Sequence, residues 1–188
     1  MSHDLHEIVG NIVSGIAKDF STIQIIKSNH CEIGKSEIHL YCSYNKSNAT
    51  EYCDVDLLII EKEKVRAIIE IEEPNGATPI TVFGKFIASA ASISAEYEPE
   101  KGFKKNLVVL DEPVTFIHIL GVKDKGSKSS QYESVGKFIK ENIMPIRGSK
   151  VNCYKQIYGT VPEFQNVSGK GREFIDYIKA LFKSLSES

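Results

Sequence analysis

The segment DVDLLIIEKEKVRAIIEIEE, residues 54–73, decides how this chain folds. Two apolar runs rich in β-branched residues, 57–60 and 65–71, flank a short charged segment, and this pattern predicts a β-hairpin. Acidic residues lie at the outer ends of both predicted strands: Asp54, Asp56, Glu70 and Glu72. The sequence therefore predicts that one end of a hairpin carries several carboxylates.

The length of the hairpin turn decides whether these carboxylates share a face of the sheet. Side chains alternate between the two faces along a strand, and directly opposed residues of an antiparallel pair point to the same face. A three-residue loop at residues 62–64 places Asp56 opposite Glu70, whereas a two-residue loop separates them. We predict the three-residue loop.

Carboxylates paired in this way need a compensating cation. Directly opposed Cβ atoms lie about 5 Å apart, and ionised carboxylates at that separation repel one another. Hard divalent ions such as magnesium bind carboxylate oxygens. Alternatively, acids at strand ends are simply solvated, but Glu70 lies inside an apolar strand, where an acid is unfavourable. We therefore predict a Mg²⁺ site, with Mn²⁺ as a substitute, formed by four acids: Asp54, Asp56, Glu70 and Glu72.

Asp56, followed across the hairpin by Glu70-Ile71-Glu72, resembles the signature of the PD-(D/E)xK nuclease superfamily. In that signature an Asp opens one strand and a (D/E)-x-K tripeptide ends the next. Glu72 stands at the usual lysine position, and in this the chain is similar to a subset of type II restriction endonucleases that carry Glu-x-Glu. The resemblance implies that Asp56 and Glu70 bind metal, while Glu72 orients or deprotonates the attacking water.

Periodicity and turn residues predict an α/β fold for the whole chain. Helices are predicted at 2–19, 80–97, 131–144 and 172–185, and further strands at 22–26, 37–44, 106–110, 115–122 and 151–158. The order resembles the α-β-β-β-α-β core of the same superfamily, which implies a restriction-endonuclease-like core with a central mixed β-sheet flanked by helices. We expect one domain, 1–188, with a core at about 2–120 completed by the strand and helices of 129–186.

Two of the predicted helices carry further candidate residues. Because Glu72 replaces the usual lysine, the resemblance makes Lys85 a candidate for a displaced cation that steadies the water or the scissile phosphate. The alternative is that Lys85 extends into solvent. Glu7 is a candidate accessory metal ligand by the same resemblance, or else a solvated acid near a helix N-terminus. His3 and His6, one helical turn apart, are predicted to be surface residues.

The segment 121–129 follows a predicted strand and precedes a helix, as a phosphate-binding loop does. A Walker A loop has its lysine directly after the second glycine, whereas Ser127 intervenes here, so nucleotide hydrolysis remains only an alternative. We predict instead that this segment contacts a DNA backbone through three lysines: Lys123, Lys125 and Lys128.

The composition is that of an ordinary globular chain, with 188 residues, 41% of them hydrophobic, and a net charge of −2. This charge excludes a generally basic nucleic-acid coat. No apolar run approaches the ~18 residues of a membrane span, and the start lacks the apolar core of a signal peptide, so we expect a cytoplasmic protein. The cysteines form no Cys-x-x-Cys pair and favour neither a zinc site nor a disulfide scaffold: Cys31, Cys42, Cys53 and Cys153.

Taken with the resemblance, these features predict a Mg²⁺-dependent DNA endonuclease, and the Glu-x-Glu variant favours a sequence-specific type II restriction enzyme. Two strands of double-stranded DNA require two active sites, so we expect a homodimer. One alternative is a structure-selective repair or recombination nuclease. Another alternative is an inactive nuclease-fold module that binds DNA or protein. A two-residue hairpin loop, or a Glu72 side chain that points away from Glu70, would favour this module.

Overall fold

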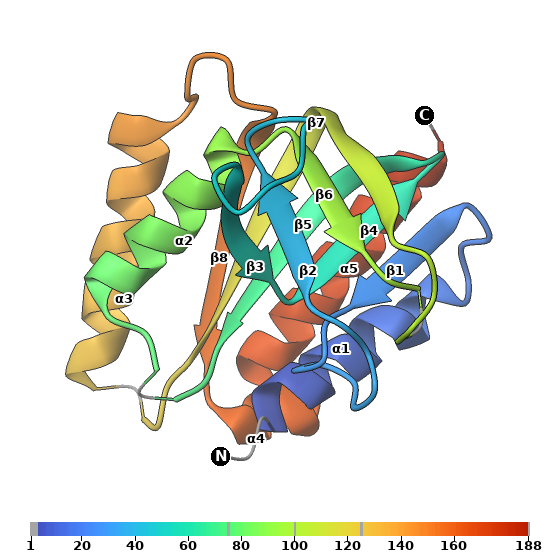
Figure 1. Ribbon diagram of the computed structural model, residues 1–188. Coiled ribbons are helices and arrows are strands. Elements are labelled where there is room, and N and C mark those ends of the chain that lie inside the picture. The colour runs from blue at the N-terminus through green and yellow to red at the C-terminus, as the bar shows by residue number, and fades with distance from the viewer. Residues whose placement is uncertain (1–3, 75, 100, 125, 188) are drawn as a thin grey trace.

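In the computed structural model the described residues, 4–74, 76–99, 101–124 and 126–187, form one eight-stranded mixed β-sheet with helices against both faces (Figure 1). The side chains of Glu112, Ser127 and Lys128 also lie outside the description. The predicted α/β class, with a central mixed sheet flanked by helices, is confirmed. None of the described helices is both long enough and apolar enough to cross a membrane.

The order of elements contains the predicted core with additions. The elements are α1 (Asp4–Ala17), β1 (Ile23–Lys27), β2 (Ile38–Tyr41), β3 (Glu51–Val55), β4 (Leu57–Glu61), β5 (Lys64–Glu72), α2 (Pro79–Ala91), β6 (Ser94–Tyr97), β7 (Asn106–Gly121), α3 (Ser127–Phe138), a π-helical turn (Ile139–Ile143), β8 (Val151–Gly159), α4 (Val161–Gln165) and α5 (Gly169–Ser186). The strands are ordered β1-β4-β5-β7-β6-β2-β3, and β8 also pairs with β7. Strands β1, β4 and β5 are antiparallel, whereas β7 and β8 continue the sheet in parallel with β5. The series α1, β1, β4, β5, α2, β7 thus follows the α-β-β-β-α-β order, with β2, β3 and β6 added.

The turn between β4 and β5 differs from the prediction. Glu61 is opposite Lys64, so the loop contains only two residues, Lys62 and Glu63. Both have left-handed backbones, with φ of 50° and 62°. A two-residue turn with positive φ at both positions matches the twist of the flanking strands, which a longer loop does not do as well. The predicted three-residue loop is therefore wrong.

A β-bulge at Arg66 compensates for the short turn. Beyond this residue the register shifts by one, and Ile59 is opposite Ala67. Continued one step past the last pair of the two strands, this register places Asp56 opposite Glu70, the pairing that the longer loop was expected to produce. The two-residue turn therefore does not separate the two carboxylates.

Two other element boundaries also differ from the sequence prediction. The helix predicted for 80–97 ends at Ala91, because Ser92 adopts an extended backbone and β6 then pairs with both β7 and β2. The strands predicted at 106–110 and 115–122 are one strand, β7, which runs through Pro113. The described pairings of β7 skip residues 111–113, so the missing N–H of the proline costs no ladder hydrogen bond there.

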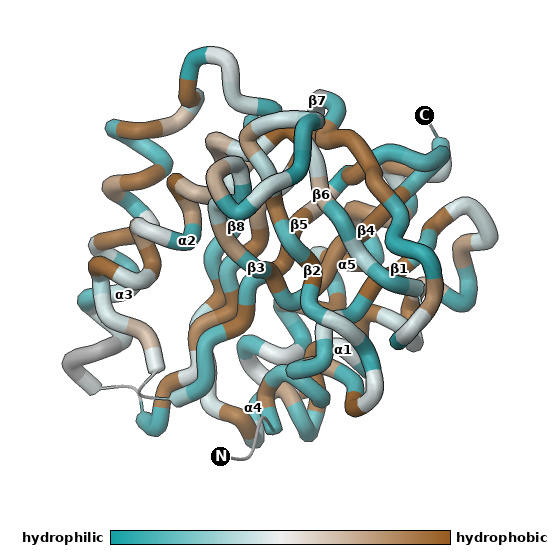
Figure 2. The backbone as a smooth tube through the Cα atoms, in the orientation of Figure 1, coloured by the Kyte–Doolittle hydropathy of each residue, from teal (hydrophilic) through white to brown (hydrophobic). Residues whose placement is uncertain are grey.

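The sheet separates two hydrophobic layers. On one face α1 and α5 pack against alternate residues of β5, Ile69 and Ile71. On the other face α2 and α3 cover a layer that includes Ile68 and Phe116. Hydrophobic residues concentrate along the central strands, whereas the helices alternate between hydrophobic and hydrophilic residues (Figure 2). Because side chains alternate along β5, Glu70 lies on the α2 face.

Candidate functional site

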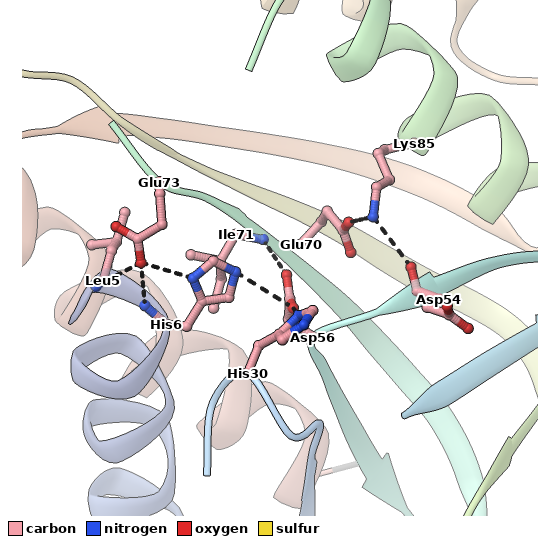
Figure 3. Close-up of polar contacts among 9 residues, drawn as sticks. All are labelled: Leu5, His6, His30, Asp54, Asp56, Glu70, Ile71, Glu73 and Lys85. Atoms are coloured by element: carbon pink, nitrogen blue, oxygen red, sulfur yellow. Dashed lines mark hydrogen bonds and ion pairs between the residues drawn. The ribbon is translucent and has the colours of Figure 1, made fainter. Parts of the chain in front are cut away.

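A pocket of about 550 Å³ lies where the carboxyl end of β5 meets α1, α2 and the β3–β4 corner. Its lining includes three of the predicted acids, the predicted lysine and two histidines: Asp56, Glu70, Glu72, Lys85, His6 and His30. Figure 3 shows the polar contacts among most of these side chains, which come from segments far apart in the sequence. The structure therefore brings together the four residues predicted to be catalytic.

Asp56 is held from both sides at the corner between β3 and β4. Its backbone oxygen accepts a hydrogen bond of 2.8 Å from the N–H of Ser28. Its Oδ2 accepts one of 2.8 Å from the N–H of Ile71. The other carboxylate oxygen, Oδ1, faces His6 and His30. Asp56 is therefore buried in a single orientation, with one oxygen directed into the site.

Glu70 is almost completely removed from solvent, with a side chain 2% exposed. Its Oε1 forms an ion pair with Lys85 Nζ, and its Oε2 has no hydrogen-bond partner among the described residues. Burial raises the pKa of Glu70 well above its usual value and the nearby Asp56 adds to the rise, while Lys85 opposes it. A buried carboxylate oxygen without a partner is unfavourable, so this position is suited to a cation.

Lys85 reaches the pocket from the first half of α2. Thr78 begins this helix as its N-cap, with Oγ1 accepting a hydrogen bond from the N–H of Thr81. The Lys85 side chain is 35% exposed, pairs with Glu70 and donates a hydrogen bond of 3.4 Å to the backbone oxygen of Asp54. Burial alone would lower the pKa of Lys85, but the Glu70 carboxylate raises it above its usual value. Lys85 is therefore a charged group of the pocket rather than a solvated lysine.

Glu72 lies two residues after Glu70 on the same strand and lines the same pocket. It is partly buried, and burial raises its pKa above the usual value, with Lys85 opposing the rise. Its position agrees with the expectation that Glu72 shares a face with Glu70.

The prediction that His6 is a surface residue is wrong, because His6 is buried at the pocket. Its Nδ1 lies 2.8 Å from Oε1 of Glu73, which also accepts a hydrogen bond of 2.9 Å from the N–H of Leu5. Glu73, directly after β5, thus anchors the first turn of α1 at the site. A signal was present in the sequence, since His6 precedes Val9 and Val13 by three and seven residues and so continues their buried stripe. His3 lies outside the described residues.

Two predicted metal ligands do not join the others. Glu7 is exposed on α1 and is not among the pocket residues, because α1 turns His6 rather than Glu7 towards the site. Asp54 belongs to β3 rather than to the hairpin, and its Oδ1 lies 2.6 Å from Nδ1 of His39. Its side chain therefore faces a neighbouring cluster with Glu37 and His39. Asp54 is not among the residues that line the pocket of Asp56 and Glu70, although it lines a small adjoining cavity of about 40 Å³ with Asp56.

The lysines predicted to contact DNA are only partly described. Lys123 is exposed two residues after β7, at the edge of the sheet where β5 also ends. Lys125 and the side chain of Lys128 lie outside the described residues. Lys128 falls within α3, which begins at Ser127, so it is not part of the loop in which it was expected.

Comparisons of this chain with protein-family models, curated proteins and solved structures found no match. Any function assigned to the pocket therefore depends on its geometry and chemistry.

Proposed function

We propose that this protein is a divalent-metal-dependent DNA endonuclease that hydrolyses phosphodiester bonds. The observation that carries the proposal is the convergence of Asp56 and Glu70 from adjoining segments of the sheet, where Glu70 is buried and its Oε2 has no partner within the described part of the chain. Carboxylate oxygens are the ligands that Mg²⁺ prefers. Asp56 and Glu70, with Glu72 beside them, would hold Mg²⁺, and Mn²⁺ is the expected substitute.

A bound divalent ion polarises the scissile phosphate and lowers the pKa of water. The protein's own groups supply positioning and proton transfer. Asp56 is oriented by the Ile71 N–H, so it needs little rearrangement on binding a ligand. Glu72 is suited to take a proton from the attacking water, since burial brings its pKa closer to neutral pH than that of a solvated glutamate.

Lys85 takes the role of the lysine that is absent at position 72. Its ammonium neutralises Glu70 in the resting site and is exposed enough to contact a phosphate oxygen at the pocket mouth. Lys85 comes from α2 rather than from β5. The pocket therefore keeps a fixed positive charge although the strand carries Glu72 at the usual lysine position.

The substrate of the proposed enzyme is double-stranded DNA, which Lys123, Lys125 and Lys128 help to hold by its backbone. A homodimer provides one active site for each strand, and the finer proposal is a sequence-specific type II restriction enzyme. One observation favours an inactive DNA-binding module instead. Oε1 of Glu70 is already neutralised by Lys85, which reduces the negative charge available to a metal.

The test is incubation of the purified protein with mixed duplex DNA in the presence of Mg²⁺, Mn²⁺ or a chelator, with products resolved on a gel. Discrete metal-dependent fragments support a sequence-specific endonuclease. Cleavage restricted to branched or single-stranded DNA supports a structure-selective nuclease. Binding of DNA without cleavage of any substrate, under either ion, overturns the catalytic proposal in favour of the inactive module.

A further inference from the structure

Two imidazoles that the proposed chemistry leaves unused converge with Asp56 on one side of the pocket. Oδ1 of Asp56 lies 3.6 Å from Nε2 of His6 and 3.5 Å from Nδ1 of His30. The three donor atoms all lie within 4.8 Å of one another. They come from α1, the loop after β1 and the β3–β4 corner, so the tertiary fold alone assembles them (Figure 3).

The orientation of His6 is set by a second carboxylate. Oε1 of Glu73 lies 2.8 Å from Nδ1 of His6 and also accepts the N–H of Leu5. An ionised carboxylate can only accept, so Nδ1 carries a hydrogen and Nε2 is the ring nitrogen turned towards Asp56. A carboxylate behind an imidazole is the usual support of a metal-binding histidine.

The distances between the three donor atoms are also those expected of ligands that share one metal ion. Ligands at 2.0–2.1 Å from a tetrahedral metal are separated by about 3.4 Å, close to the two distances from Asp56 Oδ1. The two imidazole rings are perpendicular within 12°, with centroids 5.7 Å apart, so they approach the carboxylate from different directions. Glu70 lines the same pocket, and its buried Oε2 has no hydrogen-bond partner in the segments that the structure describes.

We propose that His6, His30 and Asp56 form a site for a borderline divalent metal ion, such as Co²⁺ or Zn²⁺, which they bind in preference to Mg²⁺. Imidazole nitrogen suits transition metals, whereas Mg²⁺ prefers an all-oxygen environment. Because Asp56 is shared with the proposed catalytic carboxylates, this inference rests in part on the proposed function. It extends that function by naming the class of metal that the pocket selects.

The test is calorimetric titration of the chelator-treated full chain with Co²⁺ and, separately, with Mg²⁺, combined with the visible absorption spectrum of the Co²⁺ complex. We expect Co²⁺ to bind at one equivalent and at least about tenfold more tightly than Mg²⁺. The principal variant is His30→Ala, since the His30 side chain is 48% exposed and its removal leaves little cavity. We expect it to weaken Co²⁺ binding at least about tenfold and change the spectrum, while Mg²⁺ binding changes less than about twofold.

Two further variants separate ligation from structure. His6→Gln keeps the buried volume of His6 and should weaken Co²⁺ binding as His30→Ala does. His39→Ala is the matched control, because His39 also contacts acidic residues but in the neighbouring cluster with Glu37 and Asp54. Equal affinities for Co²⁺ and Mg²⁺, or loss of Co²⁺ binding only in His39→Ala, would overturn the inference.

Failure of this inference is distinguishable from failure of the proposed function. Mg²⁺-dependent DNA cleavage together with an unchanged Co²⁺ titration in His30→Ala leaves the nuclease proposal standing and removes the histidine site. Co²⁺ binding that depends on His30, in a protein that cuts no DNA, supports the histidine site and removes the nuclease proposal.

Discussion

The two ends of the β4–β5 hairpin each carry a buried glutamate, and they differ in how its charge is balanced. At the turn end, the Glu61 side chain is 2% exposed and lies 3.1 Å from Lys62 Nζ and 3.4 Å from Arg66 Nε. At the pocket end, Glu70 is as deeply buried but has only Lys85 as a basic partner among the described ion pairs. One acid is therefore surrounded by cations, whereas the other is crowded by further acids.

The difference shows that a buried acid in an apolar strand is not by itself a sign of a metal site. The sequence argument for Glu70, an acid within a hydrophobic run, applies equally to Glu61, which follows Ile60. What distinguishes Glu70 is the excess of carboxylates around it, Asp56 and Glu72 among them, and the pocket that they share. The same substitution, Glu61→Gln or Glu70→Gln, can therefore be compared at the two ends of the hairpin.

The largest expected effect is on DNA cleavage. Asp56→Asn and Glu70→Gln should each reduce the rate of Mg²⁺-dependent cleavage of duplex DNA at least about a hundredfold. Loss of a residue that only hydrogen-bonds a metal ligand can already cost about that much, and these two residues are proposed as the ligands themselves. Glu61→Gln should leave the rate within about twofold, because Glu61 contacts no proposed reacting group. Cleavage rates of the purified variants on one duplex substrate measure this. A Glu70→Gln variant that cuts at the wild-type rate would remove Glu70 from the proposed machinery.

The two substitutions should change stability by different amounts. The pKa of Glu70 is raised in the folded state, so its ionisation costs stability as the pH rises above the pKa of a free carboxyl group, and Gln cannot ionise. In Glu70→Gln the removal of this cost opposes the loss of the ion pair with Lys85, so without metal this variant should change the free energy of unfolding at pH 8 by less than about 1 kcal/mol. Glu61→Gln should decrease it by about 1–3 kcal/mol, because Arg66 loses its charged partner.

Urea denaturation of both variants in chelator, at pH 8 and again at pH 5, measures these changes. The stability of Glu70→Gln relative to the wild type should be lower at pH 5, where protonation of the wild-type carboxyl removes part of its cost. Equal decreases in the stability of both variants would show that the two ends of the hairpin are energetically alike.

His118 makes the pocket end sensitive to acid as well. It lies opposite Glu70 on β7, is completely buried, and neither ring nitrogen has a hydrogen-bond partner among the described residues. Burial lowers its pKa to about 3. The unfolded chain therefore takes up a proton below pH 6.5 that the folded protein does not, and stability should fall by about 2 kcal/mol from pH 6.5 to 4.5.

His118→Leu should remove this part of the pH dependence, since leucine has no proton to gain. Denaturation at several pH values between 4.5 and 7 tests it, with His39→Ala as a control that keeps His118. An unchanged slope in His118→Leu would place the acid sensitivity elsewhere in the molecule.

The effect of metal on stability should be smaller than the effects on cleavage and on acid sensitivity. A divalent ion that binds only the folded protein should add about 1.4 kcal/mol to the free energy of unfolding at a tenfold excess over its dissociation constant, and a chelator should abolish the gain. Wild type and Glu61→Gln should both show it in thermal melts with and without Mn²⁺, whereas Asp56→Asn should not. Equal stabilisation of Asp56→Asn would mean that the ion binds outside the pocket.

Local sequence patterns were sufficient to predict most of the fold around the pocket. The alternation of β5 and the apolar stripe of α1 are short-range properties, and both elements formed where they were expected. The turn length was wrong, and the bulge that restores the pairing of Asp56 with Glu70 could not be read from the hairpin. Register against β7 shifts at the same place, between Val65 and Ala67, so the bulge depends on a strand more than forty residues away.

The sequence by itself determined that the β4–β5 hairpin carries acids at both ends and that Glu70 and Glu72 share one face of β5, because alternation along a strand is a property of the chain alone. Only the tertiary structure decided which of these acids remain short of positive charge. Glu61 acquires Arg66 through the bulge, whereas the pocket acquires Lys85 from α2 and His6 and His30 from segments before the hairpin. The reason is physical: charge balance depends on distances between groups remote in sequence, and these exist only after the helices have packed on the sheet.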